Sequence, residues 1–260
     1  MIGHTANERK LYGKTWDTIH GGYFADRTVA APLVEAVLDA ASAARPDVLA
    51  DLGGGTGFLL DEVRRGLDLS PVPRLVCVDP AKDQLDSCPE HMSTLECSME
   101  DLDRGILVGP DDTLMVCMRS VLHYLGEEML KPDLGRFRSV LEDGEYLTHQ
   151  TICFSSEREQ ALANLLYDRM DTGKWFPTVG FLTATLEEEG FRLVDVRPAA
   201  PLPVESAELE QRYGIDHETM LDIGMALKRQ CAGRLSEVYH GSRNGFTAYL
   251  EYVVMTCIAV

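Results

Sequence analysis

The sequence predicts an α/β protein built on a mostly parallel β-sheet. Short apolar runs alternate with segments of helical periodicity along most of the 260 residues, which is typical of strands joined by crossover helices. The stretch VLADLGGGTGFLLDEV, residues 48–63, places a buried strand, four glycines and the start of a helix in succession. Acidic residues, Asp51 and Asp79, close two successive apolar runs. These three observations predict a ligand-binding turn at the carboxyl edge of the sheet.

The individual elements follow from the same pattern. The runs with the length and composition of strands are Val48–Leu52, Arg74–Asp79, Thr94–Cys97, Thr113–Met118, Glu145–Gln150, Arg192–Arg197 and Ala248–Ala259. The helical segments between them are Ala31–Ala44, Phe58–Gly66, Lys82–Ser87, Leu125–Leu141, Glu157–Asp171 and Thr178–Glu189. No linker separates two independent domains, so one large domain with additions is expected.

Two segments fall outside this alternation. The first precedes residue 46, and the second, residues 198–245, separates the last two strands. The second carries apolar residues at helical spacing, which predicts an amphipathic helix: Met220, Ile223, Leu227, Cys231, Leu235 and Val238. Such a stripe is more often core packing than a ligand site.

Composition excludes several classes of partner. The formal net charge of −18 argues against nucleic acid and anionic membranes. Seven cysteines without a C-x-x-C pair indicate reduced thiols in a cytoplasm. The polar N-terminus MIGHTANERK has no apolar signal region, and the longest apolar run is too short to span a membrane. We therefore expect a cytoplasmic protein that acts without nucleic acid or membrane.

The glycine turn differs from the dinucleotide fingerprint G-x-G-x-x-G. Its pattern is D-x-G-x-G-x-G, from Asp51 through Gly53 and Gly55 to Gly57, and the place of the third fingerprint glycine holds Phe58. A pyrophosphate would be repelled by Asp51, whereas a cationic ligand would be attracted. S-adenosylmethionine carries an ammonium and a sulfonium and no phosphate. A nicotinamide oxidoreductase is therefore disfavoured.

At these residues the chain resembles the class I S-adenosylmethionine-dependent methyltransferases. DLGGGTG is similar to their first motif, VCVDP to their second and CSMEDLD to their third. The resemblance implies a Rossmann-like three-layer sandwich with a helical lid, a seven-stranded sheet whose last strand is antiparallel, and S-adenosylmethionine as cofactor. The cofactor-binding residues expected from it are Asp51, Gly53, Gly55, Gly57, Asp79, Pro80, Ser98, Met99, Glu100, Met118 and Tyr23. Many members have an adenine-binding Asp where this chain has Ser98, and Glu100 is a possible substitute.

Two histidines are candidate proton acceptors for methyl transfer. His123 follows the fourth strand, where an imidazole can take a proton from a hydroxyl or ammonium, and His149 lies in the fifth strand. Either histidine could instead be a packed residue. The segment LYGKTWDTIHGGYF, residues 11–24, offers the aromatic residues Tyr12, Trp16, Tyr23 and Phe24 as a lid over the cofactor, or as the face of a packed helix.

These features resemble the small-amine branch, the phosphoethanolamine and glycine/sarcosine methyltransferases, and similar lids occur in natural-product methyltransferases. In the phosphoethanolamine enzymes a lid tyrosine and the loop histidine form a catalytic pair, which by position implies Tyr12 and His123. The absence of a basic cluster for a substrate phosphate counts against phosphoethanolamine itself.

The resulting domain assignment has three parts. Residues 1–45 form an N-terminal helical lid segment, residues 46–197 and 246–260 the S-adenosylmethionine-binding methyltransferase domain, and residues 198–245 a helical insertion that covers the acceptor pocket. The insertion could alternatively be an oligomerisation arm, and the chain is expected to be a monomer or homodimer.

The leading function is metal-independent methylation of an N, O or C nucleophile of a small-molecule metabolite. The fourth and fifth strands do not end in the carboxylates of metal-dependent methyltransferases, and zinc-type spacings are missing, so no metal is expected. The alternative is a cyclase or a non-catalytic subunit that keeps the fold and the cofactor pocket.

Overall fold

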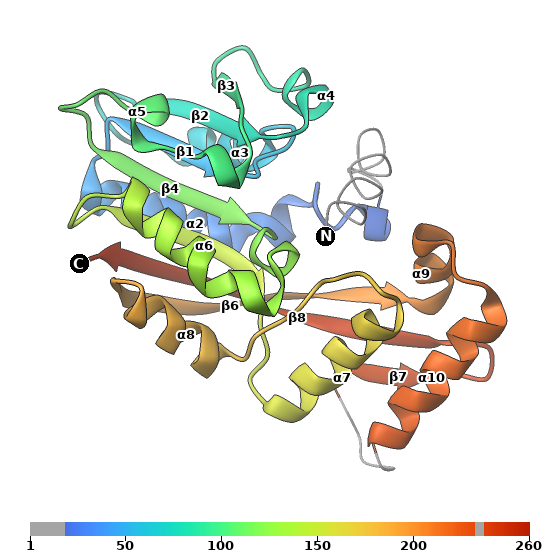
Figure 1. Cartoon of the computed structure of the whole chain (residues 1–260). Coiled ribbons are helices and arrows are strands. Elements are labelled where there is room, and N and C mark those ends of the chain that lie inside the picture. The colour runs from blue at the N-terminus through green and yellow to red at the C-terminus, as the bar shows by residue number, and fades with distance from the viewer. Residues whose placement is uncertain (1–18, 232–236) are drawn as a thin grey trace.

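The computed structural model describes residues 19–231 and 237–260, in which a single mixed sheet organises the chain (Figure 1). Its strand order is β3-β2-β1-β4-β5-β8-β6, with β7 paired to β8. The strands are β1 Val48–Leu52, β2 Arg74–Asp79, β3 Ser93–Glu96, β4 Leu114–Arg119, β5 Tyr146–Ile152, β6 Phe191–Glu205, β7 Tyr239–Gly241 and β8 Phe246–Ala259. Neighbours from β3 to β5 are parallel, and β8 runs antiparallel between β5 and β6. The predicted sheet with an antiparallel last strand is confirmed, and the short β7 is an addition to it.

Helices cover both faces of the sheet, which makes three layers. One face packs against α2 Arg27–Ala44, α3 Phe58–Gly66 and α4 Lys82–Leu85, whose buried side chains share a core with Leu49 and Met115. The other packs against α5 Arg104–Leu107, α6 Gly126–Val140 and α8 Val179–Glu188, which share a core with Val116 and Leu147. The strands β1 and β4 are buried on both sides because helices cover both faces.

A second hydrophobic core lies beyond the carboxyl edge of the sheet. There β6 and β8 continue past β5 and pack against α7 Glu157–Arg169, α9 Ser206–Tyr213 and α10 His217–Cys231, with Tyr23 and Phe24 of the N-terminal segment in the same core (Figure 1). Because β6 runs parallel to β1, the carboxyl end of β6 lies at the same edge of the sheet as the glycine turn, and β6 extends beyond that edge. We call this second core and the elements around it the cap.

The cap corrects two of the predicted boundaries. Residues 198–205 of the expected helical insertion continue β6 and pair with β8, because prolines are tolerated on an edge strand. Within the described part of the expected N-terminal lid, residues 27–44 form α2, which packs on a sheet face with Leu33, Val37 and Ala41 fully buried. The short 3-10 helix η1, Ile19–Gly22, and the residues just after it remain next to the cap.

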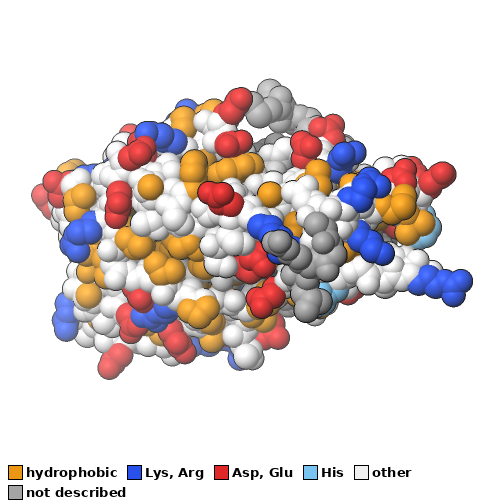
Figure 2. Space-filling model, turned by 90° about the horizontal axis from the view of Figure 1, so that it is seen from below, with side chains coloured by type: hydrophobic (Ala, Val, Ile, Leu, Met, Phe, Trp, Pro, Cys, Tyr) orange, Lys and Arg blue, Asp and Glu red, His pale blue; other side chains and the backbone are white. Residues whose placement is uncertain are grey.

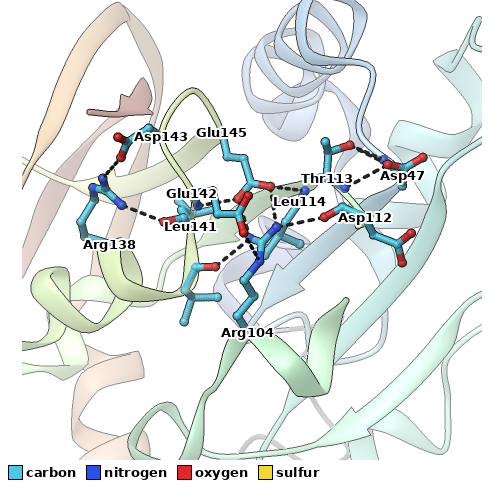
Figure 3. Close-up of polar contacts among 11 residues, drawn as sticks. Asp47, Arg104, Asp112, Thr113, Leu114, Arg138, Leu141, Glu142, Asp143 and Glu145 are labelled. Carbon is cyan, nitrogen blue, oxygen red and sulfur yellow. Dashed lines mark hydrogen bonds and ion pairs between the residues drawn. The ribbon is translucent and has the colours of Figure 1, made fainter. Parts of the chain in front are cut away.

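A polar network lies at the amino edge of the sheet, the edge away from the glycine turn (Figure 3). Glu145, which is 8% exposed, accepts hydrogen bonds from Arg104 Nη1 at 2.6 Å and Nη2 at 2.9 Å. It also accepts from the backbone N–H groups of Leu114 at 2.6 Å and Glu142 at 2.7 Å. Glu145 thus joins the amino ends of β4 and β5 to α5.

We expect Arg104→Ala to destabilise the protein by about 3 kcal/mol, because it leaves the carboxylate of Glu145 buried without its ion pair. The measurement is urea unfolding followed by circular dichroism. Lys131→Ala, which removes an exposed pair with Glu188, is the matched control and should leave the transition nearly unchanged. An equal, small effect of both substitutions would contradict the structural role of Glu145.

One face of the surface shows how charged side chains are distributed. Figure 2 shows acidic, basic and apolar side chains interspersed over one face, with no broad basic area on it. Among the residues that the structure describes, no helix is both long and apolar enough to cross a membrane.

Candidate functional site

The turn after β1 is bare of side chains at its four glycines, of which Gly53 and Gly54 are half-buried and Gly55 and Gly57 buried. Gly53, Gly55 and Gly57 have φ values of 74°, 55° and 78°, a left-handed conformation that favours glycine. At Gly54 a Cβ atom would lie 2.7 Å from Cys77 Sγ and 2.9 Å from Asp51 Oδ2. The underside of the turn is therefore packed, which explains why consecutive glycines occur there.

Asp51 is the buried charge beneath this turn. Its side chain is 1% exposed, and its Oδ1 atom has no hydrogen-bond partner. Burial, reinforced by the nearby charge of Asp79, raises the pKa of Asp51 to about 7, against the opposing effects of Arg119 and Cys117. An unpartnered buried carboxylate oxygen is costly in isolation and suits a cationic ligand group such as an ammonium.

Asp79 closes β2 beside the same turn. Its Oδ2 atom accepts the backbone N–H of Gly55 at 3.1 Å, and its Oδ1 atom accepts that of Ala81 at 2.8 Å. Each carboxylate oxygen can accept more than one hydrogen bond, so this fixed carboxylate suits a pair of ribose hydroxyls. Together the bare turn, Asp51 and Asp79 fit a ligand that carries both a nucleoside and a cation.

The third sequence motif lies next to Asp79, because the Cys97 N–H donates to the Asp79 carbonyl at 3.3 Å. Ser98 donates its hydroxyl proton to Asp101 at 2.7 Å, so its oxygen remains an acceptor for a donor such as the adenine amino group. Met99 and Pro80 are half-buried, whereas Glu100 is exposed. Of the two expected acceptors, Ser98 therefore has the more defined position.

Two of the expected site residues lie inside the core instead. The Met118 side chain is 1% exposed and packs with the residues under α6, and His149 is aligned with Met118 and Met255 on the neighbouring strands. His149 is fully buried, neither ring nitrogen has a hydrogen-bond partner, and burial lowers its pKa to about 4. Met118 and His149 thus lie within the strand core, whereas His123 belongs to the loop after β4, and the site roles of Met118 and His149 stay predictions.

The loop after β4 is held against the glycine turn. A Cβ at Gly53 would lie 2.7 Å from Val121 Cγ2. Ser120, in the left-handed region with φ 62°, is fixed by its N–H bond to the Gln150 carbonyl at 2.8 Å and its hydroxyl bond to Tyr252 at 3.0 Å. A non-glycine residue in this conformation is strained, and such strain is concentrated at functional sites.

His123 follows in the short helix η3, Leu122–Tyr124, and faces an aromatic group. Its ring centroid is 4.3 Å from that of Tyr124 and 5.9 Å from that of Phe176. The Nδ1 atom has no hydrogen-bond partner, and burial, with a smaller effect of the Lys174 charge, lowers the pKa of His123 well below its usual value. His123 is therefore a neutral imidazole at pH 7, the state that can accept a proton.

Lys174 joins His123 to the cap. Its Nζ atom donates to the Tyr213 hydroxyl at 3.1 Å and lies 4.6 Å from the Tyr124 ring centroid and 5.7 Å from that of Tyr167. Tyr167 and Tyr213 belong to α7 and α9, so elements far apart in sequence meet beside His123. No local signal in the sequence distinguishes Lys174, because only the tertiary structure brings it there.

The N-terminal segment is linked to both the sheet and the cap. Tyr23 is 6% exposed, and its hydroxyl donates to the Ala200 carbonyl of β6. The His20 N–H donates to Glu208 of α9 at 3.1 Å. Tyr12 and Trp16 lie outside the described residues. The structure thus places Tyr23 and Phe24 in the cap core.

Two further residues at the site were not among the sequence-based candidates. Arg119, at the end of β4, donates to the Phe24 carbonyl at 2.8 Å and to Gln150 Oε1 at 3.1 Å. Gln84 covers Gly55, since a Cβ there would lie 2.5 Å from its Oε1 atom. An arginine that ends the apolar run LMVCMR is itself a signal that could have identified Arg119.

In the described part of the chain, no group of three or more metal-ligating side chains is arranged to hold a metal ion.

Sequence comparisons find no relative, since no protein-family model and no curated protein matches the chain. Comparison with solved structures does find proteins of similar fold. A Bacillus halodurans C-125 protein, itself only provisionally assigned as a methyltransferase, is 14% identical, with a TM-score of 0.67 over 88% of this chain and 98% of that one. The 1,6-didemethyltoxoflavin N1-methyltransferase of Burkholderia thailandensis, solved with 1,6-didemethyltoxoflavin and S-adenosylhomocysteine, is 17% identical, with a TM-score of 0.54 over 99% and 89%.

The [4+2]-cyclase SpnF is similar as well, at 15% identity and a TM-score of 0.53 over 88% of this chain and 80% of that one. At such identities the likeness concerns the fold alone. With its strand order and its antiparallel last strand, the chain has the fold of the class I S-adenosylmethionine-dependent methyltransferases.

Proposed function

We propose that this protein is a metal-independent methyltransferase that transfers a methyl group from S-adenosylmethionine to a small molecule. The observation that carries the proposal is the pair of buried carboxylates around the bare glycine turn, with Asp51 Oδ1 unpartnered. A ligand with an ammonium and a ribose satisfies both carboxylates, whereas a pyrophosphate would be repelled by them.

Three residues around the turn would each bind a different part of the cofactor. Asp51 would hold the ammonium, directly or through water, Asp79 the ribose hydroxyls, and Ser98 the adenine amino group. When bound, S-adenosylmethionine supplies an electrophilic methyl group on its sulfonium. The chain's own task is then to align the acceptor and to remove its proton.

His123 is the residue we assign to proton removal. It lies two residues after Val121, which packs against the glycine turn, and its lowered pKa keeps the imidazole unprotonated at neutral pH. With Tyr12 outside the described residues, its partnership with His123 remains a proposal from sequence. The nucleophile on the acceptor is a nitrogen, oxygen or carbon atom of a metabolite, including those of natural-product biosynthesis.

The cap would cover the acceptor. It extends from the carboxyl edge of the sheet, and there its residues Tyr167 and Tyr213 lie around Lys174, whose charge acts on His123. A covered site excludes water from the sulfonium and leaves room for small acceptors only. Support for a small acceptor also comes from the similar 1,6-didemethyltoxoflavin N1-methyltransferase, whose structure contains bound 1,6-didemethyltoxoflavin.

The experiment that tests this function has two stages. Isothermal titration should detect binding of S-adenosylmethionine and S-adenosylhomocysteine and none of NAD. Incubation with the methyl-labelled cofactor and a panel of small hydroxyl, amine and acid metabolites should then transfer label to at least one of them. Absence of cofactor binding would refute the assignment.

A second candidate function keeps the cofactor site without methyl transfer, as a cyclase or a non-catalytic subunit. The similarity to the cyclase SpnF favours keeping it. Cofactor binding with no label transfer to any acceptor in the panel, and with methyl donor unconsumed, would support this second candidate.

Cofactor affinity should depend on pH through Asp51. Because the pKa of the free carboxyl is raised to about 7, most Asp51 is neutral at pH 6 and ionised at pH 8, and only the ionised form attracts the ammonium. We expect S-adenosylhomocysteine to bind roughly tenfold more weakly at pH 6 than at pH 8, with proton release on binding near pH 6. Titration in two buffers of different ionisation enthalpy measures both effects. Asp51→Asn should bind weakly at both pH values, and a wild-type profile in this variant would exclude Asp51 as the titrating group.

A further inference from the structure

Arg119 has a position at the cofactor site that neither the sequence motifs nor the comparisons explain. In the β1–β4 register Cys117 is aligned with Asp51. Side chains alternate along a strand, so Arg119, two residues later, lies on the same face as Asp51 and nearer the carboxyl edge. A buried anion and a cation are thus arranged one above the other beside the glycine turn.

The two charges interact without forming an ion pair. The charge of Arg119 lowers the pKa of Asp51, and the charge of Asp51 raises the pKa of Arg119. The two groups are therefore close enough to interact electrostatically. Nevertheless Asp51 Oδ1 has no hydrogen-bond partner, and the hydrogen bonds of Arg119 go elsewhere. Asp51 is buried and Arg119 is half-buried, and two opposite charges held apart in this way match the two ends of an α-amino acid, whose ammonium and carboxylate are also separated.

Arg119 also retains hydrogen-bonding capacity. Of the five guanidinium N–H donors, Nε binds Gln150 Oε1 at 3.1 Å, one on Nη1 binds the Phe24 carbonyl at 2.8 Å, and one on Nη2 makes a long contact of 3.5 Å with the Tyr23 carbonyl. Two donors have no partner among the described residues. A planar guanidinium with two spare donors is suited to a carboxylate.

The environment of Arg119 strengthens such a contact. Its Cζ atom lies 5.9, 5.5 and 5.8 Å from the ring centroids of Tyr23, Phe24 and Phe58. These rings shield part of the half-buried guanidinium from water, and a charge-assisted hydrogen bond gains strength in such surroundings. Phe58 is the first residue of α3, directly after the glycine turn, so the rings connect Arg119 to the turn itself.

We infer that Arg119 binds the carboxylate of the amino-acid end of the cofactor and, with the same guanidinium, fixes residues 23–24 over the bound molecule. The inference rests on the proposed function, because it takes S-adenosylmethionine as the ligand. Its consequence is that the carboxylate of the cofactor and the N-terminal segment are coupled: a ligand without a carboxylate fills the nucleoside site but does not tighten the segment.

The test compares three ligands by isothermal titration: S-adenosylhomocysteine, its decarboxylated analogue, which keeps the ammonium, and 5′-methylthioadenosine, which lacks both charges. Wild-type protein should bind S-adenosylhomocysteine about 30-fold more tightly than the decarboxylated analogue. Arg119→Met should remove this difference and leave affinity for the decarboxylated analogue within about threefold of wild type, as a double-mutant cycle requires. Arg119→Lys should restore part of the discrimination.

Asp79→Ala is the matched control, since it should weaken all three ligands by a similar factor of about ten through loss of the ribose contacts. Thermal unfolding of each variant confirms that the protein is folded. A second measurement is hydrogen exchange at residues 19–26, which saturating S-adenosylhomocysteine should slow in wild type and which the decarboxylated analogue should leave unchanged. In Arg119→Met neither ligand should slow it.

The outcomes separate the inference from the function on which it rests. If Arg119→Met weakens S-adenosylhomocysteine and its decarboxylated analogue equally, Arg119 is a structural residue and the inference is wrong. Slower exchange at residues 19–26 with both ligands would contradict the coupling. If wild-type protein binds none of the three ligands, the proposed function itself is wrong.

Discussion

Gly55→Val should abolish binding of S-adenosylhomocysteine in a protein that still folds. The φ of Gly55 is 55°, where a β-branched residue is strained, and a Cβ would lie 2.5 Å from Gln84 Oε1. Gln84 can move because only the end of its side chain is in the way. However, the N–H of Gly55 also holds Asp79 at 3.1 Å, so a shift of the turn displaces the carboxylate that we assign to the ribose.

The measurement is isothermal titration, with no heat of binding expected at ligand concentrations about 100-fold above the wild-type Kd. Gly144→Val is the matched control, because Gly144 also has a positive φ, of 93°, and a Cβ there meets nothing within 4 Å. It lies in the turn before β5, at the edge of the sheet away from the site, and should cost stability while leaving affinity unchanged. Wild-type affinity in folded Gly55→Val would overturn the assignment of the turn.

His123→Ala should lower turnover about a hundredfold, the usual effect of losing a general base, with cofactor affinity changed by less than about twofold. The imidazole belongs to the residue two positions after Val121, which packs against the glycine turn, and it lies beside the rings of Tyr124 and Phe176. Among the described residues, the hydrogen bonds that fix Asp79 come from the backbone and not from His123. The measurement is the initial rate of label transfer to the acceptor found by the panel, together with titration of the cofactor.

His149→Ala provides the comparison. His149 packs between Met118 and Met255 in the core, so its removal should reduce stability while leaving turnover of the folded enzyme within a fewfold of wild type. A hundredfold loss in His149→Ala, with His123→Ala near wild type, would move the base to β5.

Local patterns account for the parts of the site that could be predicted. The turn from Asp51 to Gly57 was identified because its conformation is dictated by glycine itself, and Asp79 because a parallel strand ends at the same edge as its neighbour. The predicted bounds of β1, β2 and α3 match the observed ones for the same reason: a continuous apolar run or one amphipathic face defines each.

Features that depend on contacts between distant parts of the chain could not be predicted from local sequence patterns. Whether Met118 or His149 faces the site or the core depends on which helices cover which face of the sheet, and alternation along one strand does not specify it. The strand pairing of residues 198–205 was missed because its prolines read as a loop, although an edge strand has N–H groups that need no partner.

The sequence by itself determined the α/β fold, the antiparallel last strand implied by the methyltransferase resemblance, and the glycine turn with its two acids. Each of these depends on interactions among near neighbours in the chain or on a repeated periodicity. Only the tertiary structure decided that Arg119 reaches the carbonyls of Tyr23 and Phe24, that Lys174 meets Tyr213 beside His123, and that β6 and β8 extend into a second core. Those contacts join residues between 39 and 96 positions apart, and they arise because apolar surfaces on the cap elements can be buried only against one another.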